Sequence, residues 1–103
     1  MARMNKVGTY KTTVSTSHGG WHTVTFYNTE VVKWNERQNV VILDSGGFMT
    51  ATTKTRMNQA SNQYGLGFRV FQTAFRWNVL LSNGDLLEFT DGMEFPYCTK
   101  EIA

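Results

Sequence analysis

The sequence predicts an α+β fold in which an antiparallel sheet packs against a single helix. Most of the chain consists of short runs of β-branched and aromatic residues separated by turn residues, which is typical of antiparallel strands. One central stretch changes to a helical period. The 103 residues fit one domain, 1–103, whose core needs neither metal nor disulfide. We therefore expect a curled or partly barrel-like sheet of about 5–7 strands and one central helix over about 50–64.

The strands are predicted from apolar runs and the turns between them. Residues 21–34 are rich in β-branched and aromatic residues, which suit a strand whose odd- and even-numbered side chains lie on opposite faces, with a bend at Asn28 and Thr29. The run 40–43 is continuously apolar and too short for a helix, so it is predicted as a central strand. Asn83-Gly84 predicts a hairpin with a type I′ turn, because this pair tolerates positive φ at both central positions. The other expected strands cover 10–15, 68–71, 76–81, 85–89 and 93–95.

The helix is predicted from one apolar face. Met57, Ala60 and Tyr64 recur at helical spacing, and Thr53 lies one turn before Met57. Gly65 follows at the position where a left-handed residue commonly ends a helix. The remaining helix residues are rich in Thr and Asn, which are poor helix formers. We therefore expect packing on the sheet to stabilise this helix, with its polar and basic groups facing water.

Charge is distributed unevenly along the chain, whose net charge is +2. Residues 45–83 contain four basic residues and no acidic one, whereas residues 85–103 contain five acidic residues and one basic residue. Such asymmetry can mark a surface that meets anions, and it can equally arise by chance in a chain with few charges.

The helix stretch suggests a nucleic-acid contact. Lys and Arg can neutralise phosphates, while Asn and Gln can pair with adenine edges. The alternative is a solvated polar helix face above a buried aromatic core. The candidate nucleic-acid-binding residues are Lys54, Arg56, Asn58, Gln59, Arg69 and Arg76.

The turn before the helix resembles a simple anion site. Gly46 and Gly47 allow close approach to the backbone, and Thr50 and Thr52 add hydroxyls at a helix N-terminus, where free amides favour anions. Neither GxxxxGK[ST] nor GxGxxG is present, and two glycines before a helix can form a plain tight turn. Thr50 or Thr52 is also expected to cap the helix.

No pattern in the sequence predicts catalysis, a metal site or a cofactor. His18 and His22 have no acidic residue close in sequence, and Cys98 is a lone cysteine that we expect to be a small buried thiol. An enzyme would need a pocket that gathers a histidine with acids from distant strands. No apolar run approaches the length of a membrane span, and residues 1–8 contain no signal peptide and are expected to form a loose tail. These features predict a cytoplasmic protein that is not an enzyme.

The segment 45–59, SGGFMTATTKTRMNQ, continuing to YGLGF at 64–68, resembles a family of small uncharacterised proteins of tailed bacteriophages. The similarity extends back to 29–32 and forward to Trp77, and relatives often have Trp at the position of Phe48. This resemblance implies a phage origin and a place in the host cytoplasm, without a mechanism. Two functions stay open: an accessory protein that contacts nucleic acid through 45–64, and a protein–protein interaction module acting on a host factor or in assembly.

Overall fold

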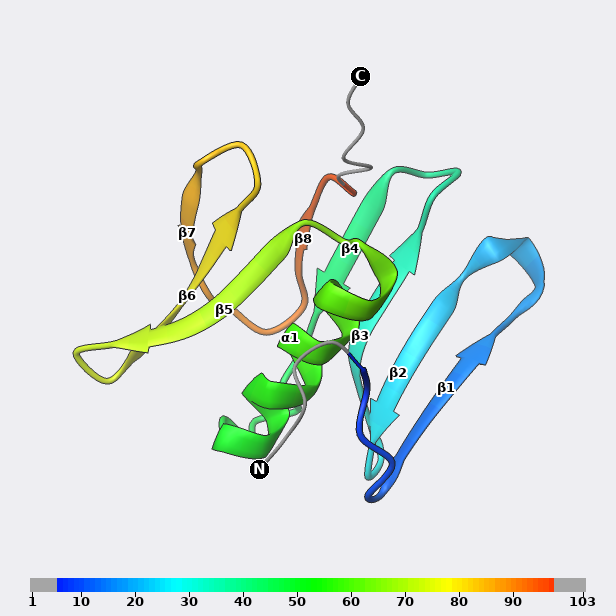
Figure 1. Cartoon of the computed structure of the whole chain (residues 1–103), viewed down its shortest axis with the longest axis horizontal. Helices are drawn as coiled ribbons and strands as arrows, with labels where there is room; N and C mark the ends of the chain where they lie inside the picture. Colours follow the sequence, from blue (N-terminus) through cyan, green and yellow to red (C-terminus); the bar gives the residue numbers. More distant parts are fainter. Residues whose placement is uncertain (1–5, 98–103) are drawn as a thin grey trace.

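The computed structural model describes residues 6–97, which form one α-helix, one short 3-10 helix (His18–Gly20) and eight strands. The elements are β1 Thr12–Thr16, β2 His22–Phe26, β3 Thr29–Asn35, β4 Val40–Leu43, α1 Ala51–Tyr64, β5 Phe68–Thr73, β6 Arg76–Leu81, β7 Leu86–Glu88 and β8 Met93–Phe95. Sheet A has the order β1-β2-β3-β4-β8, and sheet B has the order β5-β6-β7 (Figure 1). The predicted α+β fold with antiparallel strands and one central helix is confirmed. The strands number eight rather than 5–7, because 21–34 folds into the two paired strands β2 and β3, and they divide between two sheets that do not close into a barrel.

Sheet A places one row of apolar side chains across its strands. The register pairs Val14 with Val24, Val24 with Val32, and Val32 with Leu43. Because paired residues share a face of the sheet, these side chains form a continuous stripe. Val24, Val32 and Leu43 are fully buried, and burying each contributes about 1.5–3 kcal/mol. β8 comes from the far end of the described chain and pairs with β4, so residues 93–95 form the last strand of the same sheet.

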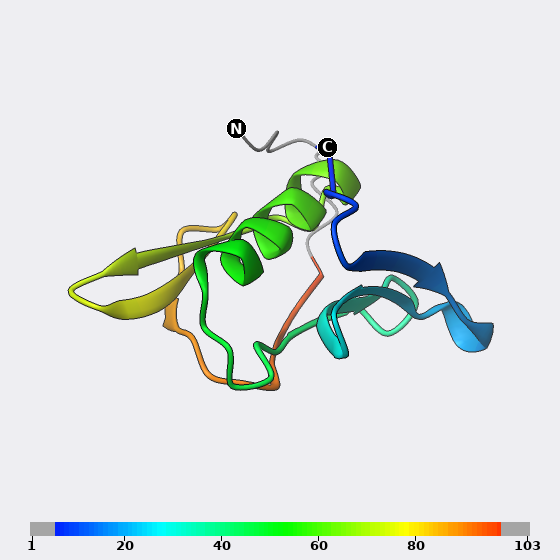
Figure 2. The same cartoon turned by 90° about the horizontal axis from the view of Figure 1, so that it is seen from below.

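The helix lies between the two sheets, on one side of sheet A and beside β5 (Figures 1 and 2). Its predicted apolar face is confirmed. Met57 and Ala60 are fully buried in the core, and the Tyr64 ring packs on Trp34 with 4.8 Å between ring centroids. The Thr50 hydroxyl accepts a hydrogen bond from the backbone N–H of Thr53, so Thr50 is the N-cap.

The start of the described chain is held against the helix. Val7 is 7% exposed, and its backbone N–H donates to Gln63 Oε1 at 2.8 Å. The N–H of Gly8 donates to Gln59 Oε1 at 3.0 Å. The expected loose tail therefore does not include residues 7 and 8, and residues 1–5 lie outside the described part.

The Asn83-Gly84 turn differs from the prediction made for it, and a second hairpin has the predicted turn geometry. In the Asn83-Gly84 loop only Gly84 has a positive φ, of 95°, and the N–H of Leu81 donates across the loop to the carbonyl of Asp85. This loop is therefore not a type I′ turn. Positive φ at both central residues occurs instead between β5 and β6, at Ala74 (53°) and Phe75 (66°). Neither residue type favours this conformation, which costs an L-residue roughly 1 kcal/mol or more.

Replacing this strained pair with Ala74→Asn and Phe75→Gly should stabilise the protein. Phe75 is 94% exposed, so its removal sacrifices almost no buried surface. Asn-Gly suits a two-residue turn with positive φ at both positions, so we expect a gain of about 1–2 kcal/mol in the free energy of unfolding, measured by chemical denaturation. Phe75→Ala alone is the control and should change stability much less, because alanine keeps the strained conformation. A double variant no more stable than this control would contradict the prediction.

Within residues 6–97, no helix has the length and apolar character required to cross a bilayer.

Candidate functional site

A groove of about 590 Å³ opens between the β2–β3 turn and the N-terminal end of α1. Its walls include four aromatic side chains, contributed by three separate segments of the chain: Tyr10, Phe26, Tyr27 and Phe48. Hydroxyl groups surround these rings, contributed by Thr29, Ser45, Thr50, Thr52 and Thr53. No Asp, Glu, Lys, Arg or His is among the residues that line this groove. We refer to it as the aromatic groove.

The rings of the aromatic groove are exposed to an unusual degree. Tyr10, Tyr27 and Phe48 are 62%, 57% and 68% exposed, and Met49 beside them is 49% exposed. A single exposed apolar residue is ordinary, whereas several gathered around one concavity are typical of an interaction site. The aromatic groove is therefore the main candidate binding surface of the described chain.

Tyr27 occupies the centre of this aromatic cluster. It lies in the turn between β2 and β3 with a φ of 56°, which a bulky L-residue rarely adopts. Its ring packs edge-on against Phe26, and its hydroxyl oxygen lies 3.3 Å from that of Tyr10. That hydrogen bond to Tyr27 raises the pKa of the Tyr10 hydroxyl, because it favours the protonated form. Backbone strain of this kind persists where the surrounding structure enforces it, often at binding sites.

Phe48 is presented by a loop that is held from within. The backbone N–H and the hydroxyl of Ser45 both donate to Asp91 Oδ1, at 2.9 and 2.7 Å. Gly46 has a φ of 64°, and a Cβ there would collide with the Thr29 side chain. The N–H of Phe48 then donates to the carbonyl of Ser45 at 3.0 Å. These contacts fix the loop, so Phe48 is presented on an organised backbone.

The predicted anion site lies in this same loop, where its amides already have acceptors. The N–H of Gly46 donates to Asp44 Oδ1 at 2.7 Å, and that of Gly47 to the Ser45 hydroxyl at 3.2 Å. The Thr50 hydroxyl caps the helix, and the exposed Thr52 lines the aromatic groove. The structure thus brings all four predicted residues to one place, together with the carboxylates of Asp44 and Asp91, which repel an anion.

Arg56 lies in the interior rather than in water, which corrects the expectation that it forms part of a solvated helix face. It is 7% exposed, and its Nε donates to Thr12 Oγ1 at 2.9 Å. Its Nη1 donates to Gln59 Oε1 at 3.2 Å and its Nη2 to the Tyr10 carbonyl at 3.5 Å. The guanidinium also lies over the Phe26 ring. Arg56 therefore joins the helix to the segment that leads into β1.

The two candidate amide side chains are likewise hydrogen-bonded within the protein. Gln59 is 2% exposed and accepts from both Arg56 and the backbone of Gly8. Asn58 donates to the carbonyl of Val70 at 2.8 Å and accepts from the N–H of Val70 at 2.7 Å. Asn58 thus binds the edge of β5 as a neighbouring strand would. In the folded chain neither amide is placed to pair with a base edge.

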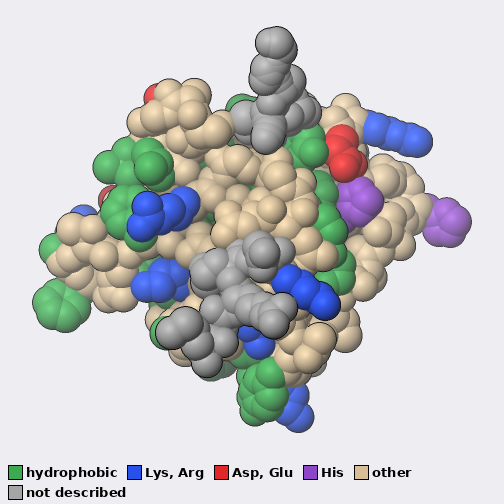
Figure 3. Space-filling view, in the orientation of Figure 1, with side chains coloured by type: hydrophobic (Ala, Val, Ile, Leu, Met, Phe, Trp, Pro, Cys, Tyr) green, Lys and Arg blue, Asp and Glu red, His purple; other side chains and the backbone are tan. Residues whose placement is uncertain are grey.

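Of the candidate basic residues, two share a surface. Lys54 and Arg69 line a groove of about 430 Å³ between α1 and β5. Figure 3 shows Lys and Arg side chains beside hydrophobic ones on the face that carries α1 and β5. Arg76 is exposed on β6 and pairs with Glu88 at 3.3 Å, outside that groove.

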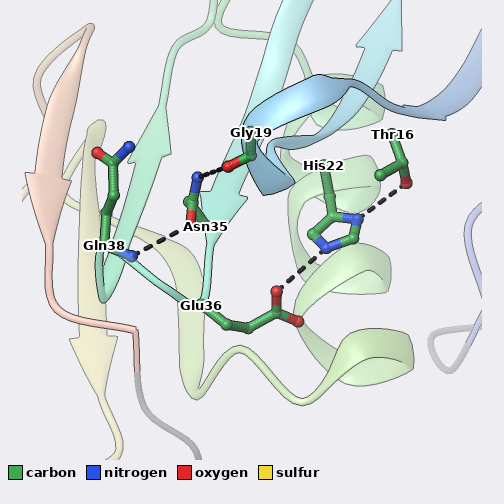
Figure 4. Close-up of polar contacts among 6 residues, drawn as sticks. All are labelled: Thr16, Gly19, His22, Asn35, Glu36 and Gln38. Carbon is green, nitrogen blue, oxygen red and sulfur yellow. Dashed lines mark hydrogen bonds and ion pairs between the residues drawn. The ribbon is translucent and has the colours of Figure 1, made fainter.

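His22 takes a structural position, whereas His18 is exposed in the β1–β2 connection. His22 lies between Thr16 Oγ1, 2.9 Å from Nδ1, and Glu36 Oε1, 3.1 Å from Nε2 (Figure 4). Its ring stacks on Trp34, with 5.1 Å between centroids. These contacts join the β1–β2 hairpin to the β3–β4 turn. Among residues 6–97, no group of three His, Cys, Asp or Glu side chains is placed to hold a metal ion, and Cys98 lies outside the described residues.

The sequence analysis does not predict the aromatic groove, because Tyr10 and Tyr27 fall within the predicted strands 10–15 and 21–34 and Phe48 lies between the Gly-Gly turn and the helix. Two signals could have indicated it. Tyr27 precedes Asn28 at a predicted bend, and Phe48 follows two glycines, so both rings sit in turns, where side chains are seldom buried. Nothing local in the sequence shows that these turns meet.

Comparison with known proteins identifies the family. The model of the Kyanoviridae Gp96 protein family matches residues 1–96. No curated protein and no solved structure matches the chain. The phage origin implied by the sequence resemblance is thereby confirmed. Because the match covers nearly the whole sequence, the chain belongs to the Kyanoviridae Gp96 protein family, a family of phage proteins.

Proposed function

We propose that this phage protein is a protein-binding module whose aromatic groove holds an uncharged, apolar segment of a partner protein in the host cytoplasm. The observation that supports this function is the clustering of exposed Tyr10, Tyr27 and Phe48 around one concavity. Covering these rings would remove a large apolar area from water, at about 25 cal/mol per Å².

The lining of the aromatic groove favours an uncharged occupant. A charged segment would lose its hydration there and find no opposite charge among the lining residues. The hydroxyls of Thr29 and Thr52 and the Asn28 amide can instead hydrogen-bond the backbone of a bound segment. Aromatic-lined grooves of this kind bind extended apolar peptides in other proteins.

The test is selection of a random-peptide library on the immobilised protein. We expect the enriched peptides to be apolar and uncharged, and Phe48→Ala to weaken their binding about 10–100-fold, as expected for an aromatic hot spot. Phe75→Ala is the matched control, because Phe75 is another exposed phenylalanine ring, in the β5–β6 turn, and does not line the groove. Enrichment of strongly charged peptides, or equal effects of the two substitutions, would argue against the proposal.

A second candidate function is nucleic-acid binding, favoured by the shared groove of Lys54 and Arg69. Phosphates lying there would contact two cations and release about two counterions. The logarithm of the binding constant should therefore fall with the logarithm of the salt concentration, with a slope of about −2. Fluorescence polarisation with single- and double-stranded DNA and RNA at low salt tests it. Binding that persists in Lys54→Gln plus Arg69→Gln, or no binding by the unaltered protein, would remove this candidate.

A further inference from the structure

The two sheets have four outer edges, and three of them are protected. Asn58 and Ser61 of α1 bind the backbone of β5 at Val70 and Phe68. β7 is three residues long and ends in Glu88. β8 is also three residues long and is followed by Pro96. Side-chain cover, short length, charge and proline are the usual means by which proteins block edge-to-edge pairing.

β1 has none of these protections. Thr12–Thr16, with the sequence TTVST, contains no charge and no proline, and its register with β2 is unbroken. Four of its five residues are exposed, including Val14 at 44%. Figure 1 shows β1 at the outer margin of sheet A, and Figure 2 shows no described element beyond it. Thr and Val also favour strand formation.

The hydrogen bonds at both ends of the β1–β2 pair identify the groups that face outward. Tyr27 N–H donates to the Lys11 carbonyl, and Ser17 N–H donates to the Trp21 carbonyl. Because bonding pairs alternate along an antiparallel ladder, the odd-numbered residues of β1 face β2. The backbone groups of Thr12, Val14 and Thr16 therefore point away from the sheet. Within residues 6–97, only the Thr12 N–H among these groups has another partner, the Thr9 carbonyl.

We propose that two copies of this chain pair through β1, antiparallel, with Val14 of one copy opposite Val14 of the other. The outward groups are symmetric about Val14, because Thr12 and Thr16 each lie two residues from it. In this register the N–H of each Val14 donates to the carbonyl of the other Val14. The N–H of each Thr16 donates to the Thr12 carbonyl of the other copy. No charged residue within the strand opposes a like charge.

A second copy of the chain suits this edge, because the outward backbone groups of β1 are arranged symmetrically about Val14. A two-fold axis is the commonest relation between identical subunits, and here it stands perpendicular to the sheet. The result is one continuous sheet with both copies of α1 on the same face. Contact through one five-residue strand covers less area than the roughly 1,200 Å² of a stable interface, so the dimer dissociates readily. The aromatic groove is not part of this pairing.

Paired charge substitutions at Val14 test both the edge and its register. By sedimentation equilibrium, the unaltered protein should dimerise in the range of about 10 µM to 1 mM. Val14→Lys and Val14→Glu should each raise the dissociation constant at least about tenfold, because like charges then face each other. An equal mixture of the two variants should dimerise again, because Lys then faces Glu. Leu86→Lys on the β7 edge is the control and should leave dimerisation unchanged.

Three results would overturn the proposal: a monomeric unaltered protein throughout that range, an unchanged dimer in Val14→Lys, or a mixture that stays monomeric. Circular dichroism verifies the fold of each variant. Phe48→Ala should leave dimerisation unchanged, so failure of the proposed peptide binding is distinguishable from failure of this pairing.

Discussion

Replacing Asn58 with alanine should lower the free energy of unfolding by about 2–4 kcal/mol. The Asn58 amide satisfies both backbone groups of Val70, and Val70 is 1% exposed. Without Asn58 a buried donor and a buried acceptor are both left unsatisfied. Chemical denaturation measures the loss, and amide hydrogen exchange should show reduced protection at Val70.

Asn58→Asp separates this explanation from a simple packing effect. Aspartate has nearly the same shape and still accepts from the Val70 N–H, but as a carboxylate it cannot donate to the Val70 carbonyl. The variant should therefore be destabilised at neutral pH, and its deficit relative to the unaltered protein should shrink in acid, because a protonated carboxyl can donate. A loss below about 0.5 kcal/mol in both variants would show that the β5 edge does not depend on Asn58.

Replacing Arg56 with alanine should destabilise the protein by about 3–4 kcal/mol. The substitution removes hydrogen bonds to Thr12, Gln59 and the Tyr10 carbonyl, and it opens a space beneath Phe26. Arg56→Met is the matched variant, because it keeps most of the apolar stem and should cost about half as much. Thermal and chemical denaturation measure both. Equal effects of the two variants would assign the whole contribution to the guanidinium.

Gly8 offers an independent check on the position of that guanidinium. A Cβ at Gly8 would lie 2.6 Å from Arg56 Nη1, closer than atoms can approach. Gly8→Ala should therefore cost about 1–3 kcal/mol in the unaltered protein and clearly less when combined with Arg56→Met. A double-mutant cycle measures this difference as a coupling energy. Additive effects would contradict the close packing of Gly8 on Arg56.

Asn58 and Arg56 both belong to the polar and basic helix residues that the sequence predicts to face water. Ser61 follows the same rule as Asn58, because its hydroxyl donates to the carbonyl of Phe68 and accepts from the N–H of Phe68. One side of α1 thus covers the edge of β5, while Arg56 and Gln59 hold the segment before β1. This explains how a helix poor in strong helix formers is stabilised: its polar side chains make tertiary hydrogen bonds.

The predictions that succeeded depend on neighbours close in sequence. The β-branched and aromatic residues of 21–34 predict extended structure with a bend at Asn28 and Thr29, and the chain is extended on both sides of a reversal there, although it forms two paired strands, β2 and β3, rather than one bent strand. The spacing of Met57, Ala60 and Tyr64 predicts the buried helix face. Gly65 was expected just past the helix and indeed adopts the left-handed conformation there. The turn at Ala74 and Phe75 had no such signal, because the strands that it joins force its conformation.

The candidate site shows the same division. The sequence by itself determined that the chain contains an amide-rich helix with two basic residues after a Gly-Gly turn, because composition and spacing are local properties. Only the tertiary structure decided which of those groups stay accessible, since the partners of Arg56 at Thr12 and Tyr10 lie 44 and 46 residues away. It also gathered Tyr10, Tyr27 and Phe48 around one groove. Contacts between segments far apart in sequence decide whether a side chain is hydrogen-bonded within the protein or stays accessible, and a local sequence pattern does not predict those contacts.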